Sequence, residues 1–331
     1  MAMGTGTQLE KQILSQPDEL DRLLTDAHAR EQVHIAAEGL HRVRRIWVVG
    51  TGSSQHAAML GAAMLQDAGR SAQAVSSMQF VRNAPIVGPH DGVVIITHTG
   101  ETAYALAARA LAFTAGLQTV TICRRGLAMN DVIETVDKET SETYTVSYTA
   151  ALLALAMVAA EMGADTVTTD RVRKVPQNVR DAIRSPGTSE IPLPQRALAV
   201  IGGGPTAVTA MEGALKSREA ARVLAEGFDA EYFLHGSAVP LNSQDQIVAL
   251  TTADDDGFVE AVAKSGEAEG IGVTRVAEPA SLPTLLQQIP LTVRLQLLAL
   301  RFAAERGQNP DTVITGRWDD KHLWSIGAPR V

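Results

Sequence analysis

Cysteine is nearly absent from this 331-residue sequence, because Cys123 is the only one. A single thiol excludes disulfide frameworks and multi-thiolate metal sites, and it suits a reducing compartment, so we expect a cytoplasmic protein. Basic residues are also scarce: 29 Lys and Arg stand against 37 Asp and Glu, which gives a formal net charge of −8. Nucleic-acid binders usually carry a clustered excess of positive charge, so we expect no nucleic-acid partner.

Long apolar runs are missing too. The most apolar stretch, AALLALAMVAA at 150–160, has only eleven residues. At about 1.5 Å of helical rise per residue it is too short to cross a bilayer, so we expect no membrane association. We interpret this stretch as a buried core or interface helix. The hydrophobic content is nevertheless 45%, and a chain of this length is expected to form roughly two domains.

Short β-rich runs alternate with segments of helical periodicity. Residues 7–40 have apolar positions at helical spacing, and Pro17 fits the first turn of a new helix. The following runs predict strands and precede polar or Gly-rich loops and helix-like segments: RRIWVVG, GVVIIT, LQTVTIC, RALAVIG, QIVALTT and GVTRVA. This alternation is typical of parallel sheets covered by helices.

The order of strand, Gly-rich loop and helix at 45–65 recurs in the second half of the chain, so we interpret the sequence as a duplicated open α/β domain. Residues 165–196 lose their periodicity and hold four prolines, which indicates a boundary. The predicted division is a helical lead-in at 1–40, a first subdomain at 41–165, a linker at 166–196, a second subdomain at 197–308 and a tail at 309–331.

Three loops follow predicted strands: GTGSSQ at 50–55, THTGET at 97–102 and GGGPT at 202–206. Ligands of open α/β sheets bind at the carboxyl ends of the strands, where these loops are expected. The first two loops are rich in hydroxyls and precede helices, an arrangement that suits a phosphate. Simple helix capping is the alternative, because Ser and Thr are favoured at helix starts in any case.

A dinucleotide site must also be considered. Gly202, Gly204 and Ala207 match the glycine pattern of such a site. The pattern requires an acidic residue that closes a strand about twenty residues later. We place that region in a helix, and we therefore expect no nicotinamide site.

The stretch 213–236 (GALKSREAARVLAEGFDAEYFLHG) has the pattern of an amphipathic helix. Lys216 and Glu219 are three residues apart, which on its own indicates a surface ion pair, and His235 beside a glycine is typically a loop-stabilising donor. The alternative is proton-transfer chemistry. A carboxylate can move a proton between adjacent carbons, an ammonium can stabilise an oxyanion, and a histidine can open a sugar ring.

The loops GTGSS and THTGET, together with EGALKSREAARVLAEGFDAEYFLHG, resemble the SIS (sugar isomerase) family, in particular the isomerase half of the glucosamine-6-phosphate synthases. The resemblance covers nearly the whole chain. It implies an α/β fold of two tandem αβα subdomains, each with a five-stranded, flavodoxin-like parallel sheet. It also implies that a sugar phosphate is held by Gly52, Ser53, Ser54, Thr97, Thr99, Gly100 and Thr102.

The same resemblance implies roles for the residues of the 213–236 stretch. Glu219 would be the acid–base residue, His235 the ring-opening residue and Lys216 a cation beside the reacting carbons. In relatives the histidine acts in the active site of the neighbouring subunit, so a homodimer with shared sites is implied.

The sequence departs from the synthase pattern in three places. It shows no counterpart of the glutaminase half, so we do not expect glutamine to be the nitrogen donor. The segment ETSETYTV places Tyr144 and Val146 where the relatives' E-x-x-V-A-S-T-K motif has a serine and a lysine. Trp318 stands where a lysine able to form a Schiff base is expected, with Lys321 or Arg317 as possible substitutes.

We expect an enzyme without metal or cofactor that isomerises or deaminates an amino-sugar phosphate, for example glucosamine 6-phosphate to fructose 6-phosphate and ammonia. One alternative is a deglycase that releases a sugar phosphate from an amino-acid adduct. The other is a non-catalytic sugar-phosphate sensor, against which we note the acid–base residue types and the lack of a DNA-binding segment beside the two domains.

Overall fold

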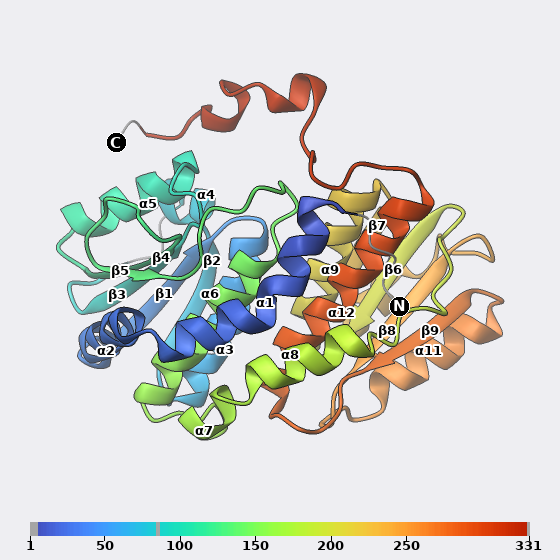
Figure 1. Cartoon of the computed structure of the whole chain (residues 1–331), viewed down its shortest axis with the longest axis horizontal. Coiled ribbons are helices and arrows are strands. Elements are labelled where there is room, and N and C mark those ends of the chain that lie inside the picture. Colours follow the sequence, from blue (N-terminus) through green and yellow to red (C-terminus); the bar gives the residue numbers. More distant parts are fainter. Residues whose placement is uncertain (1–5, 84–86, 330–331) are drawn as a thin grey trace. The chain divides into compact units, whose positions relative to one another are not determined.

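The computed structural model describes residues 6–83 and 87–329 (Figure 1). Residues 1–5 of the predicted lead-in and 330–331 of the predicted tail lie outside the described residues. Contacts within the chain define two compact units. The first-sheet unit comprises Asp18–Glu139, Val146–Lys174 and Ile314–Val331, and the second-sheet unit comprises Met1–Pro17, Thr140–Thr145 and Val175–Val313.

The first-sheet unit contains a parallel sheet of five strands in the order β2-β1-β3-β4-β5. The strands are β1 (Arg45–Gly50), β2 (Ser71–Ser76), β3 (Asp91–Ile96), β4 (Gln118–Cys123) and β5 (Val132–Glu134). Central strands β1 and β3 are buried on both faces, as expected for apolar strands of a parallel sheet. This is the flavodoxin-like order.

Helices cover the first sheet in two groups (Figure 1). Helix α3 (Ser53–Asp67) contacts α6 (Val146–Glu161), which also contacts α2 (Ala27–His41) and the short α7 (Thr169–Val172). The other group is α4 (Ser77–Arg82) and α5 (Ala103–Thr114), which contact each other. The predicted core helix is confirmed, because every residue of α6 from Val146 to Ala159 is buried. Within the described ranges, no helix combines the length and hydropathy that a membrane crossing requires.

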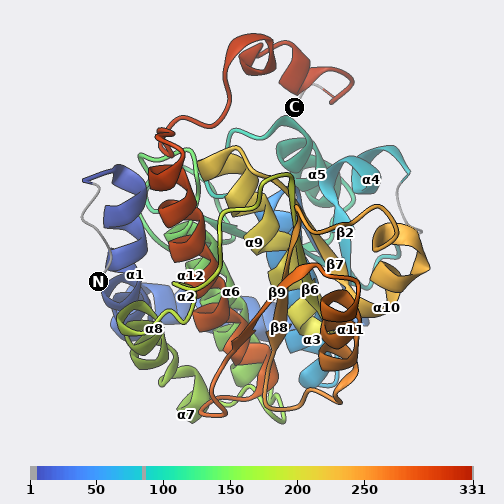
Figure 2. The ribbon, with the colours of Figure 1, turned by 90° about the vertical axis from the view of Figure 1, so that its right-hand side faces the viewer.

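The second-sheet unit contains four parallel strands in the order β7-β6-β8-β9. They are β6 (Ala197–Gly202), β7 (Leu224–Asp229), β8 (Gln246–Thr251) and β9 (Gly272–Ala277). One helix group is α8 (Val175–Arg184), α9 (Pro205–Ala221) and α12 (Thr284–Glu305), and the other is α10 (Ala230–Tyr232), the π-helix Phe233–Ser237 and α11 (Phe258–Ala268) (Figure 2). Helix α8 lies inside the predicted linker, which is therefore not irregular throughout.

The predicted α/β fold with two tandem sheet-containing units is confirmed, but the expectation of five strands in each sheet is wrong for the second one. In the described residues β9 has no further neighbour. After β9 the chain passes Pro279 and Pro283 and enters α12. Proline has no N–H to donate to a sheet ladder, so this connection does not supply an edge strand equivalent to β5.

The prediction that a new helix begins at Pro17 is also wrong, because α1 (Gln8–Thr25) runs through it. A proline inside a helix leaves the carbonyl four residues earlier without its usual donor. Here that carbonyl belongs to Ile13, and it accepts a hydrogen bond of 3.1 Å from the side-chain amide of Gln16. This bond replaces the missing one and allows the helix to continue.

The stretch 213–236 is not one helix, as its pattern predicted. Helix α9 ends at Ala221, because Arg222 adopts the left-handed conformation with φ of 56°. Strand β7 follows and pairs with β6. Gly227 in β7 allows the close approach of α9, since a Cβ there would come within 2.4 Å of the Ala210 backbone.

Each sheet has an Asp–Arg pair where its first strand begins. In the first sheet Asp91 accepts from Arg45 at 2.7 Å and from the Trp47 indole at 3.2 Å. In the second, Asp245 accepts from Arg196 Nε at 2.8 Å and from the backbone N–H of Ala197 and Asn242. Asp245 is fully buried, and the bond from Arg196, with help from these amides, lowers its pKa.

We expect Asp245→Asn to lower the free energy of unfolding by about 1–3 kcal/mol, because the amide breaks the charge-assisted bonds at a buried site. A carboxylate whose pKa is lowered by folding stabilises the fold above its unfolded pKa, and this contribution is lost as the pH falls below about 4. The variant should therefore lose less stability on acidification than the wild type. Urea unfolding between pH 3 and 7 measures both effects, with the exposed Asp170→Asn as the control. Identical pH profiles of variant and wild type would contradict this assignment.

Candidate active site

The predicted phosphate-binding residues meet at one edge of the first sheet. Strands β1 and β3 are neighbours, with Val49 opposite Ile95, and the loops leave their carboxyl ends. One loop leads through Gly52 into α3, and the other leads through 97–102 into α5. Gly52 has a φ of 57°, which favours glycine, and a Cβ on Gly50 would lie 2.2 Å from the Ser54 carbonyl oxygen. The first loop therefore requires both glycines.

Neither of these helices is capped by a hydroxyl. The N-cap of α3 is Gly52, and Thr102 at the N-cap of α5 makes no side-chain capping bond. The Thr99 hydroxyl does have a local role, because it accepts from the Glu101 N–H at 3.2 Å in the turn before α5. Helix capping at Gly52 and Thr102 therefore does not account for the hydroxyls of the two loops, and a local turn accounts for one of them. Ser53, Ser54, Thr99, Gly100 and Thr102 are all partly accessible at this edge.

Thr97 differs from the other hydroxyl residues because it is buried. Its Oγ1 has no hydrogen-bond partner among the residues that the structure describes. Its backbone N–H continues the sheet by donating to the Ile122 carbonyl at 3.0 Å.

The third predicted loop lacks the donors of the first two. Gly204 repeats the backbone conformation of Gly52, with a φ of 54°, but Pro205 occupies the first helical position and has no N–H. The Thr206 hydroxyl accepts from Gln288 at 3.4 Å. This loop is therefore poorly suited to an anion.

The prediction that the region after Gly204 is helical throughout is wrong. The region after Gly204 contains strand β7, which does end in an acidic residue, Asp229. Its carboxylate instead caps α10 by accepting from the N–H groups of Glu231 and Tyr232. The strand order β7-β6-β8-β9 also differs from the 3-2-1-4-5-6 order of the dinucleotide fold.

Lys216 and Glu219 lie in a buried cluster near the end of α9, not on a solvated face. Lys216 Nζ is 2.5 Å from Glu219 Oε2 and 3.4 Å from Glu212 Oε1. Lys216 and Glu212 are buried, whereas the Glu219 side chain keeps 20% of its exposure. Glu212 was not predicted as a site residue, although it lies four residues before Lys216, a spacing that places both on one helix face.

The cluster favours a carboxyl group that can exchange its proton. Burial, opposed by Lys216 and assisted by the charge of Glu212, raises the pKa of Glu219 above its ordinary value. Two carboxylates share one buried ammonium, so binding a proton relieves the excess negative charge. Glu219 is the accessible member, and it is therefore the group that can act on a ligand.

His235 lies far from Glu219 within the same unit. Strands β6 and β7 are parallel, with Gly202 opposite Asp229, so His235 follows the carboxyl edge of the sheet. Glu219 lies 14 residues along α9 from Pro205, about 21 Å toward the opposite edge. The structure therefore does not bring these two predicted catalytic residues together within one chain. His235 is exposed on the π-helix.

The tail returns to the first-sheet unit through two short 3₁₀ turns, Gly316–Asp319 and Leu323–Ser325. The carbonyl of Ile326 accepts from Tyr104, which follows the 97–102 loop by two residues. Trp318, Arg317 and Lys321 are all exposed. Replacement of the relatives' lysine by Lys321 or Arg317 stays a prediction.

No group of three His, Cys, Asp or Glu side chains in the described ranges is arranged to hold a metal ion. The expectation of an enzyme without metal or cofactor stays a prediction.

Comparison with known proteins identifies the fold at this site. The family model of the SIS domain matches residues 39–161, which include β1 to β5 and both hydroxyl loops. These residues form a SIS domain. The match confirms the resemblance seen in the two loop sequences.

Curated relatives extend the similarity beyond the SIS domain. The chain is 27% identical over 356 residues to the glutamine–fructose-6-phosphate aminotransferase [isomerizing] of Chlorobaculum tepidum, and 29% identical over 339 residues to that of Thermococcus kodakarensis. Each alignment covers 91% of this chain and 56% of the relative. The chain thus spans about half the length of these relatives.

Two solved structures share the fold of this chain. The tagatose-6-phosphate ketose/aldose isomerase of Escherichia coli aligns with a TM-score of 0.82 at 19% identity, over 96% of this chain and 99% of that one. The glucosamine-6-phosphate deaminase of Thermotoga maritima aligns with a TM-score of 0.77 at 19% identity, over 93% and 97%. At this level of identity the likeness shows the fold alone.

Proposed function

We propose that this protein is a SIS-type phosphosugar isomerase that acts on an amino-sugar phosphate and releases the amine as ammonia. The observation that carries the proposal is the buried cluster of α9, in which Lys216 lies between Glu212 and Glu219 and only the Glu219 carboxyl is partly accessible. The raised pKa of Glu219 agrees with a role in proton transfer. Aldose–ketose conversion requires one group that removes a proton from a carbon and returns it to the neighbouring carbon. The similar proteins are an aminotransferase, a ketose/aldose isomerase and a deaminase, and each is named after a sugar 6-phosphate.

Under this proposal the hydroxyls of the two loops bind the phosphate, and Glu219 moves the proton from carbon 2 to carbon 1 of the open-chain amino sugar. This leaves an imine at carbon 2, and one water molecule hydrolyses it to the ketose phosphate and ammonia. Lys216 is buried between two carboxylates, so we assign it a positioning role: it orients Glu219 and opposes the rise in its pKa. His235 gives and takes the proton that opens the cyclic sugar, for which imidazole is suited near neutral pH.

The distance between Glu219 and His235 supports the proposal that two copies of the chain share their active sites. Side chains around His235 are apolar and exposed: Tyr232 by 66%, Leu234 by 51% and Val239 by 82%. Neighbouring exposed apolar side chains are typical of protein interfaces. We therefore propose a homodimer in which His235 serves the site of the partner.

Mixing two impaired variants tests the shared site. We expect Glu219→Gln and His235→Asn to have strongly reduced turnover alone and to regain activity when they are unfolded and refolded together, because a mixed dimer contains one intact pair. Sedimentation should show a dimer for the wild type and a monomer for Leu234→Glu. The control is Ile35→Glu, at a comparably exposed apolar residue on α2. An active monomer, or a mixture whose turnover stays reduced, would rule out the shared site.

A substrate screen tests the proposed activity itself. The protein is incubated with hexose and hexosamine phosphates and with sugar-phosphate adducts of amino acids, and ammonia, ketose phosphate and free amino acid are assayed. Ammonia with ketose phosphate supports the proposed deamination, and ketose without ammonia indicates simple isomerisation. Release of an amino acid would indicate a deglycase, and binding without turnover would indicate a sensor.

A further inference from the structure

His98 stands between two hydroxyl residues of the 97–102 loop, and its ring makes a specific contact. Nε2 lies 3.2 Å from the backbone nitrogen of Glu139. A backbone N–H can only donate, so Nε2 must be the acceptor and the imidazole must be neutral. Burial, with the positive charges of Arg124 and Lys138, lowers the pKa of His98 to about 4, so the ring stays an acceptor near neutral pH.

Glu139 is itself fixed in place. Its side chain is buried, and Oε1 accepts from the Ser147 N–H at 2.8 Å in the first turn of α6. A carboxylate at this position also interacts favourably with the helix dipole. The backbone N–H that His98 meets is therefore anchored to the buried helix α6.

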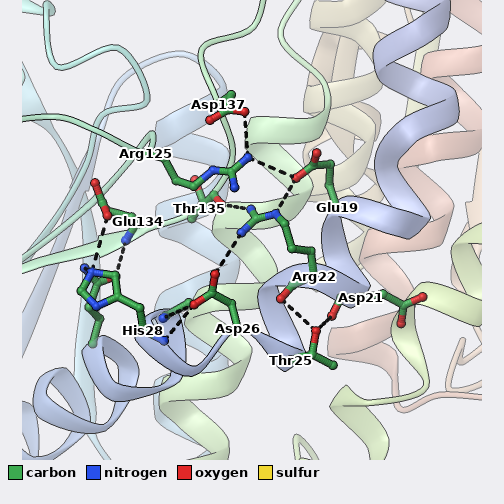
Figure 3. A network of polar contacts seen from close by, with 12 residues as sticks. Glu19, Asp21, Arg22, Thr25, Asp26, His28, Arg125, Glu134, Thr135 and Asp137 are labelled. Carbon is green, nitrogen blue, oxygen red and sulfur yellow. Dashed lines mark hydrogen bonds and ion pairs between the residues drawn. The ribbon is translucent and has the colours of Figure 1, made fainter.

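The residues just before Glu139 are held from the other side by a polar network, shown in Figure 3. Arg22 donates to the Thr135 carbonyl and is 2.9 Å from Glu19. Arg125 is 2.8 Å from Asp137 and 4.0 Å from Glu19. Each exposed pair contributes little alone, but together they join the segment 135–139 to α1. His98 thus bonds to a segment that polar contacts fix at both Thr135 and Glu139.

We propose that His98 is a positioning residue: by accepting the Glu139 N–H it fixes the 97–102 loop, and phosphate affinity depends on this bond. The inference rests on the phosphate site of the proposed function. The loop backbone is also tied to β4, because the His98 carbonyl accepts from the Arg124 N–H at 3.0 Å. The side-chain bond adds the tie to Glu139 and so restricts the hydroxyls of Thr97 and Thr99 to one arrangement.

Two substitutions of similar polarity separate this role from a general structural one. The amide oxygen of His98→Gln can take the place of Nε2, whereas the shorter side chain of His98→Asn cannot reach it. We expect the asparagine variant to bind inorganic phosphate roughly tenfold more weakly, because the partly buried N–H of Glu139 loses its acceptor and the 97–102 loop loses this support. The glutamine variant should recover most of the affinity. With a sugar phosphate that the wild type accepts as a substrate, the KM of the asparagine variant should rise and its kcat should stay unchanged.

His90→Asn is the matched control, because His90 is exposed and precedes β3 at the opposite edge of the same sheet. Affinity is measured by calorimetry, and folding by thermal unfolding. The proposal is overturned if the asparagine variant binds phosphate as tightly as the wild type, if both variants are equally weak, or if kcat falls while KM is unchanged. A wild-type protein that binds no phosphate would instead overturn the proposed function, before any variant is compared.

Discussion

Replacing Glu219 with glutamine is expected to lower turnover by about 10²–10⁴-fold while the phosphorylated ligand still binds. Glutamine keeps the size of the side chain and its capacity to accept a hydrogen bond from Lys216, which donates at 2.5 Å in the wild type. It removes only the base. The loss should therefore appear in kcat and in the exchange of the carbon-2 proton with deuterated solvent, and not in ligand affinity.

The pH dependence of turnover gives a second view of the same residue. Because the pKa of Glu219 is raised above 4.5, its active carboxylate form is lost at a higher pH than in an ordinary glutamate. The wild-type kcat/KM, which reports the ionisation of the free protein, should therefore begin to fall at a higher pH than an ordinary glutamate would cause, and this decline should disappear from the residual activity of the glutamine variant.

Glu269→Gln is the control, since Glu269 is an exposed carboxylate of the same unit. Full turnover and full proton exchange in Glu219→Gln would leave the Lys216–Glu219 pair as a purely structural ion pair. Stability is measured alongside, because removing one charge from a buried cluster also changes the free energy of unfolding.

The central strands could be predicted from the sequence and most of the edge strands could not. Strands β1, β3, β4, β6 and β8 are apolar runs because both of their faces are buried in the helix layers. Edge strands β2, β5 and β7 are short or contain polar residues and glycine. Their pairing depends on the neighbouring strand, which periodicity along one segment does not reveal.

The candidate site divides in a similar way. The hydroxyl loops could be predicted because a short polar segment between a strand and a helix has a local signature. Burial of Lys216 and the role of Glu212 could not, because both depend on α12 packing against α9. A lysine and a glutamate at helical spacing have the same pattern on a solvated face and in a core. Only the tertiary contacts separate a weak surface pair from a carboxyl with a raised pKa.

The contact between His98 and Glu139 could not be predicted from the sequence for the same reason. His98 and Glu139 are 41 residues apart in the sequence, and their bond depends on the position of the segment after β5. The hydroxyls of THTGET have a local sequence signature, whereas the histidine between them has none.

A sugar 6-phosphate is expected to bind at least about 100-fold more tightly than the same sugar without phosphate. Hydrogen bonds to a charged group contribute about 1.5–3 kcal/mol each, so two of them already produce this difference. Thr99→Val should weaken binding of the phosphorylated sugar by roughly tenfold and leave binding of the unphosphorylated sugar unchanged, because under the proposal the O–H of Thr99 donates to the phosphate. Its oxygen accepts from the Glu101 N–H at 3.2 Å, and this bond leaves the hydroxyl proton available for the ligand. Thr206→Val, in the corresponding loop of the second-sheet unit, is the matched control and should change neither affinity. The affinities of the wild type, Thr99→Val and Thr206→Val for both sugars are measured by calorimetry. Equal affinities of the wild type for the two sugars would contradict a phosphate site at this edge of the first sheet.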